Sequence, residues 1–318
     1  MMEQAIKDFA KQFRFKPEIK NSDRYSPTGR FIVCGMGGSH LAADILQSIE
    51  PKIDLAIRRD YGLPERTDGA TVVVSSYSGN TEEALDAYEQ ARQHGLPMLA
   101  IAVGGKLIEQ ALRDNVPYIQ LPDTGIQPRS ALGFSFLALL KALGQDELLN
   151  QASALNSLKP LGCKPAGKEL AKKLKGKVPV IYASTRNKAV AYNWKIKLNE
   201  TGKLPAFMNV VPELNHNEMT GFDAATPATK RLVKPFSVLM LTDAEDHPRI
   251  QKRMTILEQL FTGRELPVTL VPLEGSSRLE KVFSSLLTAD WLAVTLAKKY
   301  HAEAEQVPMI EEFKKLME

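Results

Sequence analysis

The sequence predicts an α/β protein of two tandem units, each a parallel β-sheet flanked by helices in an α-β-α sandwich. Short, almost continuous apolar runs alternate with amphipathic helical patterns, which is typical of a parallel sheet covered on both faces. This alternation stops in a lysine-rich stretch, residues 151–177, and then restarts. The length of 318 residues suits two domains of about 150 residues each. We therefore expect domains at residues 1–152 and 153–318.

Each element of the first unit follows from a local pattern. Five β-rich apolar runs predict strands at 30–34, 53–58, 71–76, 98–103 and 117–121. Amphipathic patterns predict helices at 41–49, 81–94 and 106–113. Residues 130–143 are apolar almost all round, which predicts a buried helix.

The second unit repeats the pattern after a connecting pair of helices. Its predicted strands are 178–183, 207–211, 236–242 and 267–273. Its predicted helices are 188–200, 249–261, 277–300 and 308–316.

Composition excludes several classes of protein. Hydrophobic residues make up 44% and charged residues 25% of the chain, as in ordinary cytosolic globular proteins. A net charge of +4 is too weak to indicate nucleic-acid binding, and no apolar run is long enough for a membrane span. Cys34 and Cys163 do not make a disulfide framework, and the N-terminus does not resemble a signal peptide. We expect a cytoplasmic protein that binds neither membrane nor nucleic acid.

Two unusual loops follow predicted strands of the first unit. GMGGSH (35–40) and SYSGNTEE (76–83) each end a strand and open a helix. Such turns present backbone N–H groups and the positive helix end to an anion, at the sheet edge where open α/β folds bind ligands. Two simpler interpretations stay open, since the glycines could form only a tight turn and Asn80 or Thr81 could be only a helix cap.

The second loop favours a phosphomonoester as the ligand. Three hydroxyls within six residues, at a helix start, suit the three oxygens of a phosphate group. The Gly-Lys-Ser/Thr triplet of a nucleotide-binding P-loop is absent, and the loop contains no lysine. Neutral hydrogen bonds and the helix dipole would therefore hold the ligand.

GMGGSH followed by SSYSGNTEE resembles the sugar isomerase (SIS) domain of phosphosugar isomerases and phosphosugar-responsive regulators. The resemblance covers about residues 25–145. It implies that Ser76, Ser78 and Thr81 bind the phosphate and that Gly38 and Ser39 face the sugar.

The second half places ionisable groups at the ends of apolar elements. Glu200 ends a predicted helix, where the helix dipole disfavours a carboxylate, and His216 lies in a stretch that is neither helix nor strand. Metal-free aldose–ketose isomerisation needs a proton shuttle to open the sugar ring and a carboxylate to move a proton between C2 and C1. Histidine suits the first role and glutamate the second. No His/Asp/Glu cluster has metal-ligand spacing, so no metal or cofactor is expected.

Over about residues 25–317 the chain is also similar to the bifunctional phosphoglucose/phosphomannose isomerases. LNETGKLPA matches the motif that carries the catalytic base, here Glu200. PELNHNE matches the motif of the ring-opening histidine, here His216, which in the family comes from the neighbouring subunit. QPRSALG supplies Arg129, which the resemblance expects to stabilise the enediol oxygen.

The resemblance weakens near the C-terminus. The family usually has a Gly-x-Asp-Pro turn where this chain has KKYHAEAEQVP. A lysine of the last helix is expected to assist ring opening, and Lys314 matches it best, with Lys315 and Lys298 left open. Thr288 resembles a threonine that leaves room for rotation about C2–C3, so that both epimers react; a packed polar residue is the alternative.

The resemblance therefore implies a metal-independent isomerase that interconverts glucose 6-phosphate, and mannose 6-phosphate, with fructose 6-phosphate. It also implies a homodimer with shared active sites. The alternative is a non-catalytic phosphosugar sensor, but such regulators usually carry a helix-turn-helix domain, for which about 30 residues leave no room. A glucosamine synthase would need a glutaminase domain, which is not present.

Overall fold

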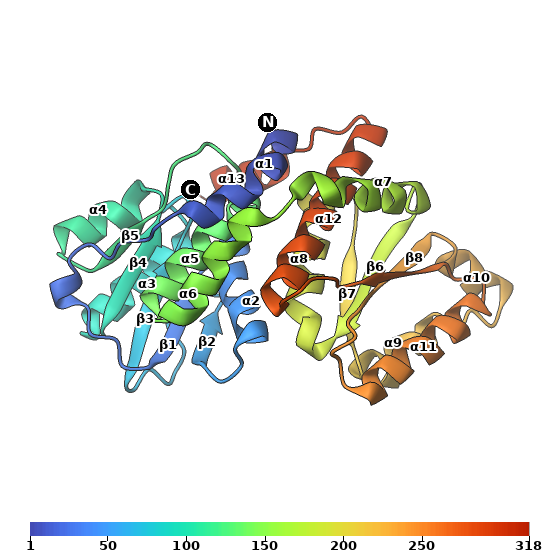
Figure 1. Cartoon of the computed structure of the whole chain (residues 1–318), viewed down its shortest axis with the longest axis horizontal. Helices are drawn as coiled ribbons and strands as arrows, with labels where there is room; N and C mark the ends of the chain where they lie inside the picture. The colour runs from blue at the N-terminus through green and yellow to red at the C-terminus, as the bar shows by residue number, and fades with distance from the viewer. Residues whose placement is uncertain (318) are drawn as a thin grey trace. The chain divides into compact units, whose positions relative to one another are not determined.

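The computed structural model describes residues 1–317 and contains two compact units (Figure 1). The N-terminal unit comprises Lys7–Leu158. The C-terminal unit comprises Lys159–Glu318 together with Met1–Ile6. Each unit is a parallel sheet covered by helices, which confirms the predicted fold class.

The N-terminal unit is built on a five-stranded parallel sheet of order β2-β1-β3-β4-β5. All five predicted strands form, as β1 (Arg30–Cys34), β2 (Asp54–Arg58), β3 (Ala70–Ser75), β4 (Met98–Ala102) and β5 (Tyr118–Gln120). The helices of this unit are α2 (Leu41–Ile49), α3 (Glu82–Gln93), α4 (Gly105–Arg113), α5 (Leu132–Ala142) and α6 (Asp146–Ser153). A further helix, α1 (Met2–Asp8), begins the chain.

Burial explains the continuous apolar runs. Every residue of β3 and β4 is buried, because helices cover both faces of a parallel sheet. In α5 only Lys141 escapes burial, which confirms the predicted buried helix.

The C-terminal unit has a four-stranded parallel sheet of order β7-β6-β8-β9. Its strands are β6 (Val178–Ser184), β7 (Phe207–Val211), β8 (Phe236–Thr242) and β9 (Val268–Pro272). Its helices are α7 (Lys164–Lys173), α8 (Lys188–Glu200), α9 (Glu218–Gly221), α10 (Pro227–Val233), α11 (Pro248–Thr262), α12 (Arg278–Lys299) and α13 (Pro308–Met317). Figure 1 shows this sheet between α8 and α12 on one face and α11 on the other.

The two sheets share a topology that fixes where ligands can bind. In each, the chain runs from the first strand to one neighbour and then crosses to the other side of the first strand. The crevice at such a reversal lies at the carboxyl edge of the strands. Within residues 1–317, no helix is both long and apolar enough to cross a membrane.

Candidate active site

Two loops at the carboxyl edge of the N-terminal sheet are tied to each other. The Tyr77 backbone N–H, just after β3, donates a hydrogen bond of 2.8 Å to Oγ of Ser39, just after β1. The Ser75 hydroxyl donates to the Ser39 carbonyl oxygen at 3.2 Å. Ser39 is buried, and these two hydrogen bonds link the glycine loop to the serine-rich loop.

Glycine permits a third loop to approach the first. A side chain at Gly38 would place its Cβ 3.0 Å from the Pro128 carbonyl carbon and 3.2 Å from the Arg129 nitrogen. Any larger residue at 38 would therefore push the Arg129 segment away. The structure thus brings the predicted residues Gly38, Ser39 and Arg129 to one sheet edge.

The serine-rich loop is organised around Ser76, whose side chain is buried. Its Oγ lies 2.8 Å from Oγ1 of Thr81 and accepts a hydrogen bond from the Gly79 N–H at 3.1 Å. Ser78 is exposed, and its Oγ accepts from the Asn80 N–H at 3.2 Å. The Ser78 O–H therefore still has a proton to donate to a ligand.

The start of α3 can receive an anion. Thr81 occupies the N-cap position but its side chain makes no capping hydrogen bond. The first N–H groups of a helix have no intrahelical acceptor, and the helix dipole favours negative charge there. The open interpretation of Thr81 as a simple capping side chain is therefore wrong, since its hydroxyl bonds Ser76 instead.

The start of α4 contacts the serine-rich loop, and the sequence did not predict this contact. The Asn80 side chain accepts from the Lys106 N–H at 3.0 Å. Gly79 has a φ of +74°, and a Cβ there would lie 1.8 Å from the Gly104 carbonyl oxygen. Only glycine at 79 allows this packing.

Arg129 is held by a residue far away in the chain. Only 4% of its surface is exposed, and its Nη1 donates to Oε1 of Gln127 at 3.4 Å. The buried Gln12 side chain donates to the Ser130 carbonyl at 2.6 Å and accepts from the Gly133 N–H at 2.9 Å. Gln12 therefore fixes the turn that carries Arg129; its place in an amphipathic N-terminal stretch gave no sign of this role.

His40 and Asp44, which follow the glycine loop in the chain, form a second supporting contact. His40, 2% exposed, has its Nδ1 2.6 Å from a carboxylate oxygen of Asp44, which also pairs with Arg59. The ion pair between Asp44 and Arg59 joins the start of α2 to the segment after β2. The only sequence signal for the contact between His40 and Asp44 is their spacing of four residues, from the N-cap of α2 to the first turn of that helix.

Glu200 is the last residue of α8, as predicted, and is partly buried. One turn earlier, the Lys197 ammonium donates to Asp290 of α12 at 2.6 Å, with both side chains buried. The Asn199 side chain donates to the Leu204 carbonyl oxygen at 3.0 Å, just before β7. These contacts fix the end of α8 at the edge of the sheet where β7 begins.

His216 lies at the other edge of this sheet. It ends a short 3-10 turn, Glu213–His216, that is separated from β7 by Pro212, and its side chain is exposed. The five residues of β7 span about 16 Å at a strand rise of about 3.3 Å per residue. The structure therefore does not bring Glu200 and His216 of one chain together.

The candidate lysines lie in different environments. Lys298 pairs with Glu3, and this pairing holds the pKa of the Glu3 carboxyl below its usual range. Lys314 and Lys315 lie on α13, all of whose described side chains are exposed; Lys314 pairs with Glu311 at 2.8 Å. The Thr288 hydroxyl donates to the Ser284 carbonyl within α12 at 3.1 Å.

The carboxyl edge of the second sheet carries an ionic network that the sequence reasoning missed. The fully buried Asp243 side chain accepts from Lys281 and from Arg278, each at 3.0 Å. Burial by itself would raise the pKa of Asp243, but the Glu245 N–H and the Lys281 ammonium outweigh it, so this pKa lies below its usual range. The acidic run TDAED, which begins with the last residue of β8, is the sequence feature that could have indicated this network. In the described part of the chain, no group of three or more His, Cys, Asp or Glu side chains could hold a metal ion.

Comparison with known proteins matches both units. A family model described as the bacterial phospho-glucose isomerase C-terminal SIS domain matches residues 164–317. A bifunctional phosphoglucose/phosphomannose isomerase of Caldicellulosiruptor bescii is 38% identical over 303 residues, 89% of this chain and 87% of that protein. One from Aquifex aeolicus is 32% identical over 317 residues, covering 97% and 96%. The crystal structure of a hypothetical protein from Thermus thermophilus has a TM-score of 0.70 at 17% identity, covering 99% and 87%, which supports the fold alone.

Proposed function

The chain belongs to the family of bifunctional phosphoglucose/phosphomannose isomerases and is a sugar-phosphate isomerase, and we propose how its residues divide the reaction. It interconverts glucose 6-phosphate and mannose 6-phosphate with fructose 6-phosphate, through ring opening and an enediol intermediate. The observation that carries the proposal is the convergence of three loops, with hydroxyls, a helix N-terminus and one buried arginine, at a single sheet edge.

The loop 76–81 anchors the phosphate. Ser78 and Thr81, with the first N–H groups of α3, donate hydrogen bonds to its oxygens, and Ser76 holds these donors in place from inside the loop. Gly38 and Ser39 bring the first loop against the sugar. Every donor in the loop is neutral, so no side-chain cation of the loop neutralises the phosphate. The dipole of α3 supplies the electrostatic attraction instead.

Glu200 is the base. Its carboxylate removes the proton from C2 of the open-chain aldose and returns it to C1, passing through the enediol. The Lys197–Asp290 pair supports it by holding the last turn of α8 on α12. Arg129 stabilises the charge that develops on the enediol oxygen, since a buried guanidinium needs no reorganisation when that charge appears.

His216 opens the sugar ring by passing a proton between the ring oxygen and the anomeric hydroxyl, with Lys314 assisting. The separation of His216 from Glu200 along β7 supports a homodimer in which each site takes its histidine from the partner subunit. The exposed apolar side chains of α13, among them Met309 and Phe313, supply a surface that a second copy of the chain could cover. Thr288 leaves room for rotation about C2–C3, which lets both epimers react.

The reaction needs no metal or cofactor, and the enzyme works in the cytoplasm. A non-catalytic phosphosugar sensor would need the phosphate loop but not Glu200 or His216. The test is to assay the purified protein with glucose 6-phosphate and mannose 6-phosphate in the presence of EDTA. Formation of fructose 6-phosphate from both is expected. Binding without turnover would favour the sensor, and loss of activity that zinc restores would refute the metal-free mechanism.

A further inference from the structure

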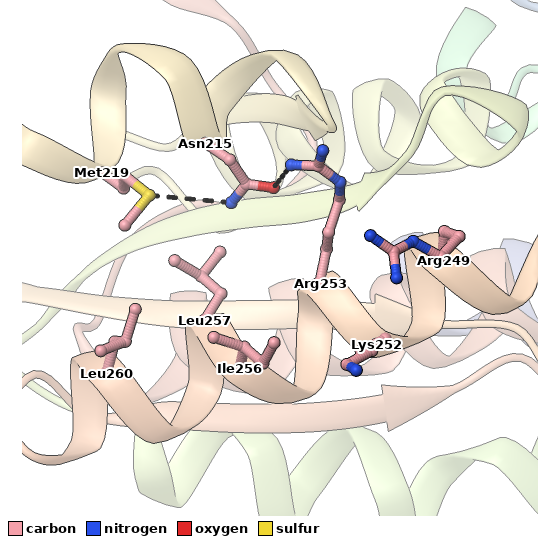
Figure 2. A pocket seen from close by; sticks show the side chains of 8 residues that line it. All are labelled: Asn215, Met219, Arg249, Lys252, Arg253, Ile256, Leu257 and Leu260. Carbon is pink, nitrogen blue, oxygen red and sulfur yellow. Dashed lines mark hydrogen bonds between the residues drawn. The ribbon is translucent and has the colours of Figure 1, made fainter.

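A pocket of about 370 Å³ lies between α11 and the segment that follows β7 in the C-terminal unit (Figure 2). One wall is a face of α11 that carries Arg249, Lys252 and Arg253. The opposite wall carries Asn215 and Met219. The volume falls within the range of pockets that bind small molecules, about 300–1,000 Å³.

No carboxylate among residues 1–317 neutralises the cations of this pocket. Arg249, Lys252 and Arg253 are spaced so that they share one face of α11. Across residues 1–317 none of the three lies within ion-pair distance of a carboxylate; Arg253 donates one long hydrogen bond, 3.5 Å, to Oδ1 of Asn215. Like charges at this spacing repel one another on a helix, so an anion placed between them would be stabilised.

The rest of the lining is apolar. Ile256 is 43% exposed at the pocket, Leu257 forms its buried floor, and Met219 faces them from the other wall. No aromatic side chain among the described residues lines the pocket, so a nucleotide base would find nothing to stack on. The ligand chemistry that fits is a small phosphomonoester with a hydrocarbon body.

The pocket is connected to His216 by the chain itself. Asn215 precedes His216, and its side chain reaches Arg253 on one side and Sδ of Met219 at 3.9 Å on the other (Figure 2). A phosphate that draws the Arg253 guanidinium into the pocket would move it away from the Asn215 oxygen, which it contacts through one long hydrogen bond of 3.5 Å. Binding would thus release one of the contacts that hold the turn ending at His216.

We propose that this pocket is an effector site for a small phosphomonoester with an apolar body, and that its occupancy alters the ring-opening step. The binding site stands independently of the isomerase reaction, whereas the coupling to His216 rests on the proposed function.

The test uses phenyl phosphate, which joins a dianion to an apolar ring, and isothermal titration calorimetry of the full chain. The Ser78→Ala/Thr81→Val double variant weakens the phosphate loop, so the binding that it retains reports the pocket. Adding Arg249→Ala/Lys252→Ala to that variant should raise the Kd at least about tenfold, since each cation gives up a charge-assisted hydrogen bond. Lys230→Ala/Arg231→Ala, an equal loss of charge on exposed residues of α10, is the control and should leave the Kd unchanged.

Kinetics then test the coupling. With an intact phosphate loop, phenyl phosphate should change kcat for the cyclic sugar, and Arg249→Ala/Lys252→Ala should abolish that change. The proposed site would be refuted if the Ser78→Ala/Thr81→Val protein did not bind phenyl phosphate. It would also be refuted if the α10 control lost as much affinity as the Arg249→Ala/Lys252→Ala variant. Binding with an unchanged kcat would overturn the coupling alone. A protein that binds phenyl phosphate but isomerises nothing would refute the proposed function and leave the site standing.

Discussion

Glu200 and His216 lie at opposite edges of one parallel sheet: α8 ends at Glu200 where β7 begins, and His216 follows the end of β7. A base that acts at C2 and C1 and a ring-opening group that acts at the ring oxygen and the C1 hydroxyl must both reach neighbouring atoms of the same sugar. The sheet prevents this within one copy of the C-terminal unit. Two predictions follow from this separation, one about the division of the reaction and one about the proposed homodimer, and one pair of variants tests both.

Glu200→Gln keeps the shape and hydrogen bonding of the side chain but removes the proposed base. We expect kcat to fall by about 10²–10⁴-fold while the sugar phosphate still binds, measured by steady-state kinetics and by calorimetry. His216→Ala should instead impair the cyclic sugar most and keep a larger share of activity on an open-chain substrate. Equal losses on both forms of substrate would contradict this division of labour.

Mixing the two inactive variants should restore activity. In a heterodimer one of the two sites would recover both residues, so up to about half of the wild-type activity per heterodimer is expected. The control is each variant incubated alone, with subunit exchange demonstrated by differently tagged chains. Failure to recover activity after proven exchange would mean that both residues act within one chain.

Ser76 and Ser78 should respond differently to the same substitution. Ser78 is exposed, so Ser78→Ala should raise KM about 10- to 100-fold, for a lost hydrogen bond of about 1.5–3 kcal/mol to a charged oxygen, with little change in thermal stability. Ser76 is buried and bonds Gly79 and Thr81, so Ser76→Ala should lower Tm as well as raise KM. The result that would refute this is a selective loss of kcat in Ser78→Ala.

Gly79→Ala should disrupt the phosphate loop. Its Cβ would lie 1.8 Å from the Gly104 carbonyl oxygen, in addition to the strain of a φ of +74°. Gly95→Ala is a matched control, because its φ is +63° but no atom lies within 4 Å of the new Cβ. We expect Gly95→Ala to cost only the left-handed strain, about 1–2 kcal/mol, with KM unchanged. Gly79→Ala should raise KM; an unchanged KM would show that the contact with Gly104 does not shape the loop.

Asp243 should stabilise the C-terminal unit in a pH-dependent way. Its pKa is lowered in the folded protein, so its contribution is complete above its unfolded-state pKa of about 4 and is lost as the pH falls through the lower folded value. Asp243→Asn removes the buried carboxylate that pairs with Arg278 and leaves Lys281 only its ion pair with Glu245, so it should cost about 3–5 kcal/mol at pH 7. Urea unfolding between pH 7 and pH 3 should also show a shallower acid dependence than in the wild type. Asp60→Asn, at an exposed aspartate, is the control, and an equal effect of both changes would contradict the role given to Asp243.

The sequence by itself determined the strands, the longer helices and the order of the loops, whereas the short helices α1, α9 and α10 were not predicted. All nine predicted strands formed, and central strands such as β3 and β4 left an unbroken apolar run because both of their faces are buried. The ends of those strands also identified the loops at 35–40 and 76–83, because the carboxyl edge of a parallel sheet is fixed by chain direction. The helix that ends at Glu200 was predicted for the same local reason.

Only the tertiary structure decided what supports these groups. Gln12 reaches the turn of Arg129 across more than a hundred residues, and Lys197 meets Asp290 on another helix. The separation of Glu200 from His216 likewise depends on which way α8 and β7 run through the second unit. Such contacts leave no periodic trace in the sequence, because each depends on two segments whose proximity is created by folding rather than by spacing along the chain.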